Sequence, residues 1–150
     1  MTAQSCSPAA FRTAVVPAAG LGTRFLPTTK AVPKELLPVV DTPGIELVAT
    51  EAAAAGAQRL LIVTSPGKES VAEYFRADPD LEKTLRERGK DALAEKIGRA
   101  PSLLEVESVY QYEPKGLGHA VAQAGPALAD DEQAVAVLLP DDLVLPTGVL

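Results

Sequence analysis

The sequence of 150 residues has one cysteine, one histidine, no tryptophan and only 4% aromatic residues. Cys6 alone cannot form an internal disulfide or a multi-cysteine zinc site. His119 alone excludes a histidine-cluster metal site and a conventional Ser/His triad. Few aromatic residues argue against a surface on which nucleic-acid bases stack, and a net charge of −6 argues against one that neutralises phosphates. We therefore expect no nucleic-acid partner.

Long apolar runs are also missing, and none approaches the ~20 residues that a membrane span requires. No membrane partner is therefore expected. The first residues, 1–10, contain neither the basic region nor the apolar core of a secretory signal. We predict a cytoplasmic protein in which residues 1–12 form a flexible N-terminal arm and residues 13–150 form one domain.

Acidic residues are absent from the first 34 positions, and all 20 of them follow from Glu35 onward. The acid-free segment contains Arg12, Arg24, Lys30 and Lys34. An acidic protein with one basic segment is expected to bind an anion locally rather than a polyanion over a broad surface. A basic loop without a function is the simpler alternative.

Apolar runs alternate with helix-forming stretches along the chain. The predicted strands are residues 13–17, 59–64, 103–111 and 134–139. The predicted helices are residues 44–57, a stretch after Gly67 to residue 75, residues 80–98 with a break near Gly89, and residues 116–128. This alternation predicts an α/β fold with a mainly parallel sheet, whose ligands bind beyond the carboxyl ends of the strands. Residues 18–34, 111–119 and 141–142 follow strands, so we expect them to converge on one site.

Residues 18–24, Ala-Ala-Gly-Leu-Gly-Thr-Arg, directly follow the first predicted strand. Glycines let backbone N–H groups approach a phosphate, and Arg24 supplies a planar fork of donors. Lys34 can return to the same phosphates as a point charge. A tight turn without a ligand is the structural alternative.

A dinucleotide-binding Gly-x-Gly-x-x-Gly loop is the chemical alternative, with Asp41 at the position of the ribose-binding acid. However, Phe25 stands where close packing requires the third glycine. Pro27 and Pro33 would also interrupt the helix that should follow.

Residues 111–120 form the second motif, Gln-Tyr-Glu-Pro-Lys-Gly-Leu-Gly-His-Ala. The Gln111 amide offers a donor and an acceptor side by side, which can pair with the N3–H and O4 edge of uracil or thymine. Gly116 would let its backbone approach the base. A turn that starts a helix is the alternative, and His119 is as compatible with simple packing as with a functional role.

Asp141 and Asp142 follow the last predicted strand. A carboxylate at this place can hold Mg²⁺ against substrate phosphates. Because adjacent strand side chains point to opposite faces, only one of the two is expected to serve. A solvated acidic turn is the alternative. We find no nucleophile-elbow or Cys/His motif, whereas a metal-assisted direct displacement needs no covalent nucleophile.

Together these segments resemble the sugar-phosphate nucleotidylyltransferases, and within them the bacterial UTP–glucose-1-phosphate uridylyltransferases. The match extends over residues 13–150 and is carried by residues 16–24, 29–38, 111–120 and 139–142. The resemblance implies a Rossmann-like three-layer α/β/α fold, Mg²⁺ as cofactor and a homo-oligomer at full length. It also implies that UTP and glucose 1-phosphate react by in-line displacement, without a covalent intermediate, to give UDP-glucose and pyrophosphate.

The resemblance also implies a role for individual residues. Arg24 and Lys34 would be catalytic and neutralise the leaving pyrophosphate, and Asp141 would bind the metal, with Asp142 as second choice. Gln111 and Gly116 would read the uracil. The other substrate-binding residues that it implies are Ala18, Ala19, Gly20, Gly22, Thr23, Glu35 and His119.

Members of this family are considerably longer than this chain, and their sugar-binding half has no counterpart in it. We therefore expect this chain alone to bind nucleotide weakly and to be inactive. A thymidylyltransferase or another sugar-1-phosphate nucleotidylyltransferase stays open, because uracil and thymine present the same edge to Gln111. So does a non-catalytic nucleotide-binding module, with a dinucleotide oxidoreductase as a distant third.

Overall fold

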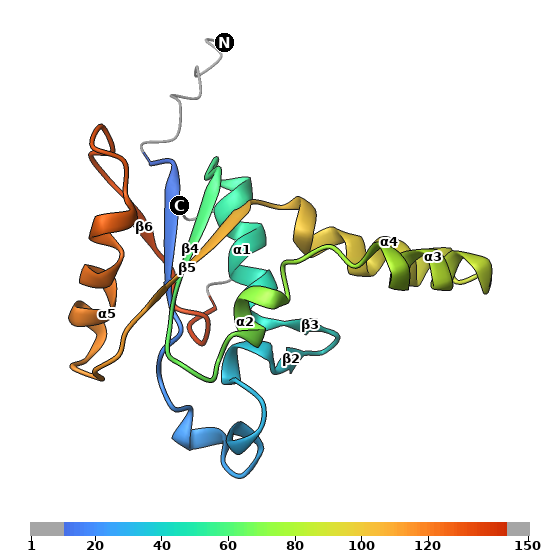
Figure 1. The fold of residues 1–150 in the computed structure, drawn as a ribbon, viewed down its shortest axis with the longest axis horizontal. Helices are drawn as coiled ribbons and strands as arrows, with labels where there is room; N and C mark the ends of the chain where they lie inside the picture. The colour runs from blue at the N-terminus through green and yellow to red at the C-terminus, as the bar shows by residue number, and fades with distance from the viewer. Residues whose placement is uncertain (1–10, 144–150) are drawn as a thin grey trace, which may run out of the picture.

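The computed structural model describes residues 11–143, and its centre is a parallel four-stranded sheet (Figure 1). The strands are β1 (Thr13–Pro17), β4 (Arg59–Thr64), β5 (Glu105–Tyr110) and β6 (Ala136–Val137), in the order β5-β4-β1-β6. Val15 of β1 lies opposite Leu61 on one side and Val137 on the other. Since all four strands run in the same direction, their carboxyl ends lie at one edge of the sheet.

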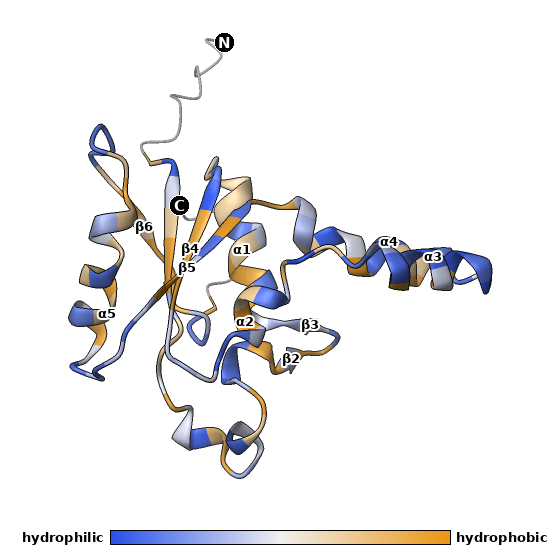
Figure 2. Cartoon of the chain, viewed as in Figure 1, coloured by the Kyte–Doolittle hydropathy of each residue, from blue (hydrophilic) through white to orange (hydrophobic). Residues whose placement is uncertain are grey.

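Helices cover both faces of the sheet, as Figure 1 shows. On one face α1 (Gly44–Ala54) and α2 (Ser70–Glu73) cover side chains such as Val16 and Ile62. On the other face α5 (Leu117–Gln123) covers Val15, Leu61 and Val63. Successive residues of one strand thus enter two separate cores. In Figure 2 the strands between the helices carry many orange, hydrophobic residues. The predicted three-layer α/β/α fold is confirmed.

Helices α3 (Pro79–Glu87) and α4 (Asp91–Arg99) form an arm that projects from the body (Figure 1). Asp78 caps α3 by accepting a hydrogen bond from the Leu81 N–H at 2.9 Å. Gly89 has a φ of 67°, a conformation that suits glycine at a helix end. The predicted break near Gly89 is therefore confirmed. η4 (Ala100–Ser102) then leads into β5.

Between β1 and α1 the chain forms short turns instead of a long helix. These are η1 (Thr23–Phe25), η2 (Thr28–Lys30) and η3 (Lys34–Leu36), followed by a hairpin of β2 (Pro38–Val39) and β3 (Thr42–Pro43). Recurring prolines account for this, because each lacks an N–H group and restricts the residue before it. The segment crosses the carboxyl edge of the sheet and provides most of the candidate site.

Five predicted elements are shorter in the structure, and β5 and α2 are two of them. β6 covers only two residues of the predicted 134–139, pairs with β1 alone among the described residues and leaves Val137 44% exposed. α5 ends at Gln123, because Pro126 cannot continue the helix and the chain tightens into η5 (Gly125–Ala127). α1 ends at Ala54, and Gly56 has a φ of 97°.

The predicted N-terminal arm, residues 1–12, lies mostly outside the described residues, as do residues 144–150 of the predicted domain. The last two residues of this N-terminal arm contact the body of the protein. Phe11 packs against the core, and the Arg12 guanidinium lies 2.6 Å from the Asp131 carboxylate. Within residues 11–143, no helix is both long enough and apolar enough to span a membrane.

Candidate nucleotide-binding site

The three predicted segments meet at the carboxyl edge of the sheet, around a cavity of about 360 Å³. This volume lies within the range of small-molecule sites. Each segment provides part of the lining: Ala19, Gly20 and Lys34 from the first, Gln111 and Gly116 from the second, and Asp141 from the third. Pro17, Pro114, Leu117, Ala120 and Leu139 complete the wall. The expected convergence is confirmed.

The glycine-rich loop presents its backbone to the cavity. The Ala18 N–H donates to the Val63 carbonyl at 2.7 Å, which fixes the loop to β4. The next four N–H groups, of residues 19–22, donate to no acceptor among the described residues. Such a row of free N–H groups can hold phosphate oxygens.

Gly22 gives the loop its close packing. It has a φ of 64°, and its carbonyl accepts a hydrogen bond from the Thr29 hydroxyl at 2.7 Å. A Cβ added at Gly22 would lie 3.0 Å from the Thr29 side chain and 3.2 Å from Cβ of Lys34. Only glycine therefore combines this backbone conformation with the approach of Lys34.

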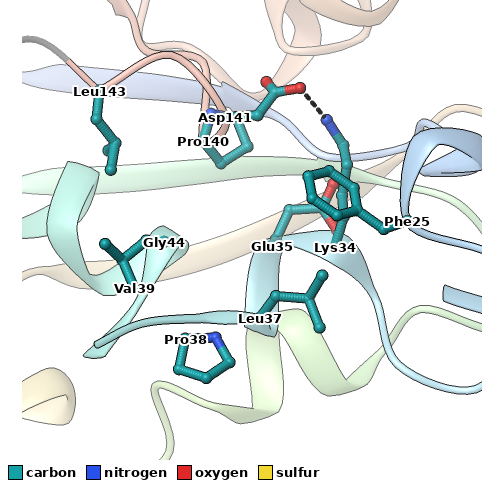
Figure 3. A pocket seen from close by; sticks show the side chains of 10 residues that line it. All are labelled: Phe25, Lys34, Glu35, Leu37, Pro38, Val39, Gly44, Pro140, Asp141 and Leu143. Carbon is teal, nitrogen blue, oxygen red and sulfur yellow. Dashed lines mark hydrogen bonds and ion pairs between the residues drawn. The ribbon is translucent and has the colours of Figure 1, made fainter. Parts of the chain in front are cut away.

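Beside the cavity lies a hollow of about 180 Å³ that contains both predicted catalytic cations. Gly20, Gly22, Thr23, Arg24, Phe25, Lys34 and Asp141 line it. Nζ of Lys34 donates to Oδ2 of Asp141 at 2.8 Å, and Figure 3 shows these two side chains pointing toward each other. This hydrogen bond, with the charges of Lys34 and Arg24, holds the pKa of Asp141 below its usual range.

Asp141 and Asp142 are placed differently. Asp141 lines the cavity and the hollow, whereas Asp142 lines neither of them. A second hollow, of about 210 Å³, lies between Asp141 and the β2–β3 hairpin (Figure 3). A Cβ on Gly44 would lie 2.9 Å from the Pro140 carbonyl oxygen, so the glycine lets the 140–141 turn approach the start of α1.

Gln111 is 7% exposed and is held by its own segment. Its amide nitrogen donates to the Gly116 carbonyl at 3.2 Å and lies 2.9 Å from Nδ1 of His119. Nε2 of His119 lies 3.2 Å from the Gln123 amide nitrogen. The amide nitrogens of Gln111 and Gln123 thus lie against the two ring nitrogens of His119, one on each side of the ring. His119 contacts Gln111 and does not line the cavity.

Two more predicted substrate-binding residues lie away from the cavity and the adjoining hollow of Arg24. The Ala18 side chain is buried in the core. The Glu35 side chain is fully buried, and its carboxylate lies 2.9 Å from Nζ of Lys68. Both therefore support the loop from beneath in this structure.

Lys68 is the residue that sequence reasoning missed. It follows β4 in the turn Ser65-Pro66-Gly67 and reaches the underside of the glycine-rich loop, where it donates to the Ala18 carbonyl and, at 3.0 Å, to the Gly20 carbonyl. The available signal was its position: a lysine in a Pro-Gly turn after a strand of the same sheet edge.

The protein side chains at this edge suit a metal shared with a substrate. Asp141 offers hard carboxylate oxygens, and its side chain is 40% exposed. Within residues 11–143 no group of three or more His, Cys, Asp or Glu residues could hold a metal ion. This donor set fits Mg²⁺, which binds through one or two carboxylates together with substrate phosphates and water.

The structure does not support the dinucleotide alternative. A turn of 3-10 helix, η1, follows the glycines in place of the long helix that such a site requires. Asp41 lies in the β2–β3 hairpin, where its carboxylate is 2.6 Å from Nζ of Lys96. It does not line the cavity with Gly20 and Gln111.

Comparison with known proteins agrees with this geometry. The sequence profile described as "Nucleotidyl transferase" matches residues 13–148. The chain belongs to the nucleotidyl transferase family.

Individual relatives and solved structures within this family are also similar to the chain. A UTP–glucose-1-phosphate uridylyltransferase of Bacillus subtilis (strain 168) is 49% identical over 133 residues, which cover 89% of this chain and 45% of that protein. UTP–glucose-1-phosphate uridylyltransferase 2 of Staphylococcus saprophyticus is 47% identical, with coverages of 87% and 45%. A solved structure of UTP-bound UGPase from Acinetobacter baumannii has a TM-score of 0.80 at 45% identity, covering 87% of this chain and 46% of that one. The chain thus spans about half the length of these relatives.

Proposed function

We propose that this nucleotidyl transferase chain is the nucleotide-binding part of a UTP–glucose-1-phosphate uridylyltransferase. The observation that carries the proposal is the meeting of Gln111, the glycine-rich loop and Asp141 around one cavity. A pyrimidine reader, a row of free N–H groups and a carboxylate are the three parts that a bound nucleoside triphosphate and its metal require. Relatives of 47–49% identity that carry this enzyme name support the choice of UTP and glucose 1-phosphate.

Gln111 would select the base. Its amide nitrogen is engaged by the Gly116 carbonyl and by His119, which fixes the plane of the amide. The carbonyl oxygen of the Gln111 amide can then accept the N3–H of uracil, while the Gly116 backbone lies near the base edge. His119 would act by orienting Gln111 rather than by touching the base.

The loop and the two cations would orient the phosphates. Free N–H groups of residues 19–22 hold phosphate oxygens, and Arg24 and Lys34 neutralise the charge that grows on pyrophosphate. The sugar-phosphate oxygen attacks the α-phosphorus while the bond to the pyrophosphate oxygen breaks in line. The contribution of the protein is positioning and charge stabilisation, with no covalent intermediate. Asp141 would hold Mg²⁺, which when bound neutralises charge on the phosphate oxygens.

The proposal includes a cytoplasmic location, as predicted from the sequence, and a homo-oligomer at full length, which rests on the resemblance to the family. A thymidylyltransferase is the second candidate. The observation that favours it is the carbonyl oxygen of the Gln111 amide, which is free within residues 11–143, because thymine offers it the same N3–H donor as uracil does.

Calorimetric titration of the 150-residue chain tests the base choice. With Mg²⁺ present, UTP should bind more tightly than ATP or GTP by ~1–3 kcal/mol, the range for a buried hydrogen-bond pair. Equal affinities would contradict base reading by Gln111, and tight NAD binding would revive the dinucleotide alternative. Tighter binding of dTTP than UTP would favour the thymidylyltransferase.

A further inference from the structure

Three acceptors surround the Lys68 ammonium beneath the glycine-rich loop. They are the carbonyl oxygens of Ala18 and Gly20, the latter at 3.0 Å, and Oε2 of Glu35 at 2.9 Å. The side chain of Lys68 is 14% exposed and that of Glu35 is fully buried. An ammonium group has three N–H donors, and two of them are donated to the loop carbonyls. The Glu35 carboxylate adds an ion pair to these two hydrogen bonds.

The buried charge of the Glu35 carboxylate is compensated by the Lys68 ammonium group. Within residues 11–143, neither of its carboxylate oxygens has a hydrogen-bond donor of good geometry, and the ion pair with Lys68 compensates its charge. Glu35 belongs to η3 and directly follows Lys34, which lines the cavity. The pair thus joins the turn after β4, the glycine-rich loop and the segment of Lys34.

The direction of the two carbonyls sets the direction of two N–H groups. In a trans peptide the C=O of one residue and the N–H of the next point to opposite sides. The only cis peptide bond in the described residues joins Leu26 to Pro27, so the peptides after Ala18 and Gly20 are trans. With both carbonyls directed at Lys68, the N–H groups of Ala19 and Leu21 point away from it. Gly20, between them, lines the cavity and the hollow of Arg24, and it also lines a hollow of about 190 Å³ together with Leu21 and Lys68.

We propose that Lys68, compensated by Glu35, is a positioning residue that turns the Ala19 and Leu21 N–H groups toward the nucleotide phosphates. The inference rests on the proposed function and adds a residue to it. Buried ion pairs contribute little net stability, because desolvation offsets their attraction, so a geometric role is the better account of this pair. Lys68 acts through the loop backbone and does not touch the substrate.

The test compares the affinity of the 150-residue chain for UTP with its affinity for uridine, which lacks phosphates. Removing Lys68 alone would leave Glu35 buried and uncompensated, so the main variant is the double substitution Lys68→Met with Glu35→Gln. Lys68→Arg retains the charge and the donors. Lys83→Met, on the exposed face of α3, is the matched control, because its ion pair with Glu87 lies far from the loop in sequence and is 76% and 65% exposed.

In the double variant the dissociation constant for UTP should rise at least ~10-fold, the equivalent of one charge-assisted hydrogen bond, while that for uridine stays constant. Lys68→Arg should recover most of the affinity, and Lys83→Met should change neither constant. A folded double variant that loses UTP and uridine affinity by the same factor, or loses neither, would overturn the inference, since either result assigns the pair to stability alone.

Amide NMR spectra separate this inference from the proposed function. A wild-type chain that binds neither UTP nor uridine would refute the proposed function. The inference is then decided by the Ala19 and Leu21 amide signals, which should move in the double variant and stay in place in Lys83→Met. Unchanged loop signals in the folded double variant would overturn it.

Discussion

Two lysine–glutamate pairs of this chain have the same chemistry and opposite surroundings. Lys68 and Glu35 come from distant segments, lie 2.9 Å apart and have side chains that are 14% and 0% exposed. Lys83 and Glu87 are one turn apart on α3, lie 3.9 Å apart and are 76% and 65% exposed. Water and salt screen the second pair, so it contributes little. The first is shielded, and breaking it leaves a buried charge.

The same contrast separates the carboxyl edge from helix α3 of the arm. At the edge, ion pairs join segments that the sheet brings together, such as Lys34 with Asp141. On the arm, two ion pairs follow the helical i,i+4 spacing, and Leu81 and Leu93 are about half exposed, at 44% and 47%. Charge at the edge therefore fixes the relative positions of loops, whereas charge along α3 mainly solvates a helix. At the α4 end of the arm, Lys96 and Arg99 pair with Asp41 and Glu46 of distant segments.

The largest expected effect tests whether the cations at the carboxyl edge of the sheet stabilise charge during the reaction. In a protein of the full length of its relatives, Arg24→Ala should lower turnover by ~10²–10³, the usual loss when one group that stabilises developing charge is removed. Arg88→Ala, at the exposed end of α3, is the control and should leave turnover unchanged. A pyrophosphate-release assay measures both. Wild-type turnover in Arg24→Ala would make Arg24 a surface residue like Arg88.

Removing the glutamate from each pair measures the contrast in stability. Glu35→Ala should lower the free energy of unfolding by about 3 kcal/mol, because it leaves the Lys68 ammonium buried and uncompensated. Glu87→Ala should change it by less than about 0.5 kcal/mol. Urea denaturation followed by circular dichroism gives both values. Similar losses in the two variants would remove the distinction between the edge and the arm.

A third prediction compares two neighbouring aspartates of the carboxyl edge, Asp141 and Asp142, in their effect on UTP binding. Asp141→Asn should weaken UTP binding in the presence of Mg²⁺ ~10-fold and have little effect in EDTA, because its carboxylate is the proposed metal ligand. Asp142→Asn should have less effect, since this residue does not line the cavity. Calorimetry with and without Mg²⁺ checks this. A larger loss in Asp142→Asn would reverse the assignment.

The smallest effect concerns the tie between the β2–β3 hairpin and α4. A hydrogen bond from Lys96, with a second from Thr42, lowers the pKa of Asp41. A carboxyl group with a lowered folded-state pKa contributes stability above its unfolded pKa of ~3.9, and this is lost as the pH falls through the folded value. Asp41→Asn should therefore slightly reduce the loss of stability between pH 6 and pH 3. Equal acid sensitivity in urea titrations would mean that solvent screens this pair fully.

Much of the fold could be predicted from local pattern. Apolar runs gave β1 and β4 their correct bounds, and Gly89 marked the end of α3. The run at 134–139 was overestimated, because composition reports hydrophobicity and not the number of neighbouring strands. The structure pairs β6 with β1 alone among the described residues, and only two residues of the run are in the strand.

The candidate site was predicted in outline, because parallel strands place the segments that follow them at one edge. Gln111, Lys34 and Asp141 do line one cavity. The support beneath the loop was missed: no role was predicted for Lys68, and Glu35 was expected to bind the substrate. Their pairing depends on where the turn after β4 lies relative to η3, which no local spacing encodes.

The sequence by itself determined the alternation of strands and helices, the proline-punctuated turns and the residue types available for a nucleotide. These follow from side-chain size, backbone freedom and charge, which act over a few residues. Tertiary structure alone decided which charges meet. It paired Lys34 with Asp141 and buried Glu35 against Lys68, because the sheet brings distant segments within reach. Around Glu35 the fold also excludes the water that would otherwise screen the charges.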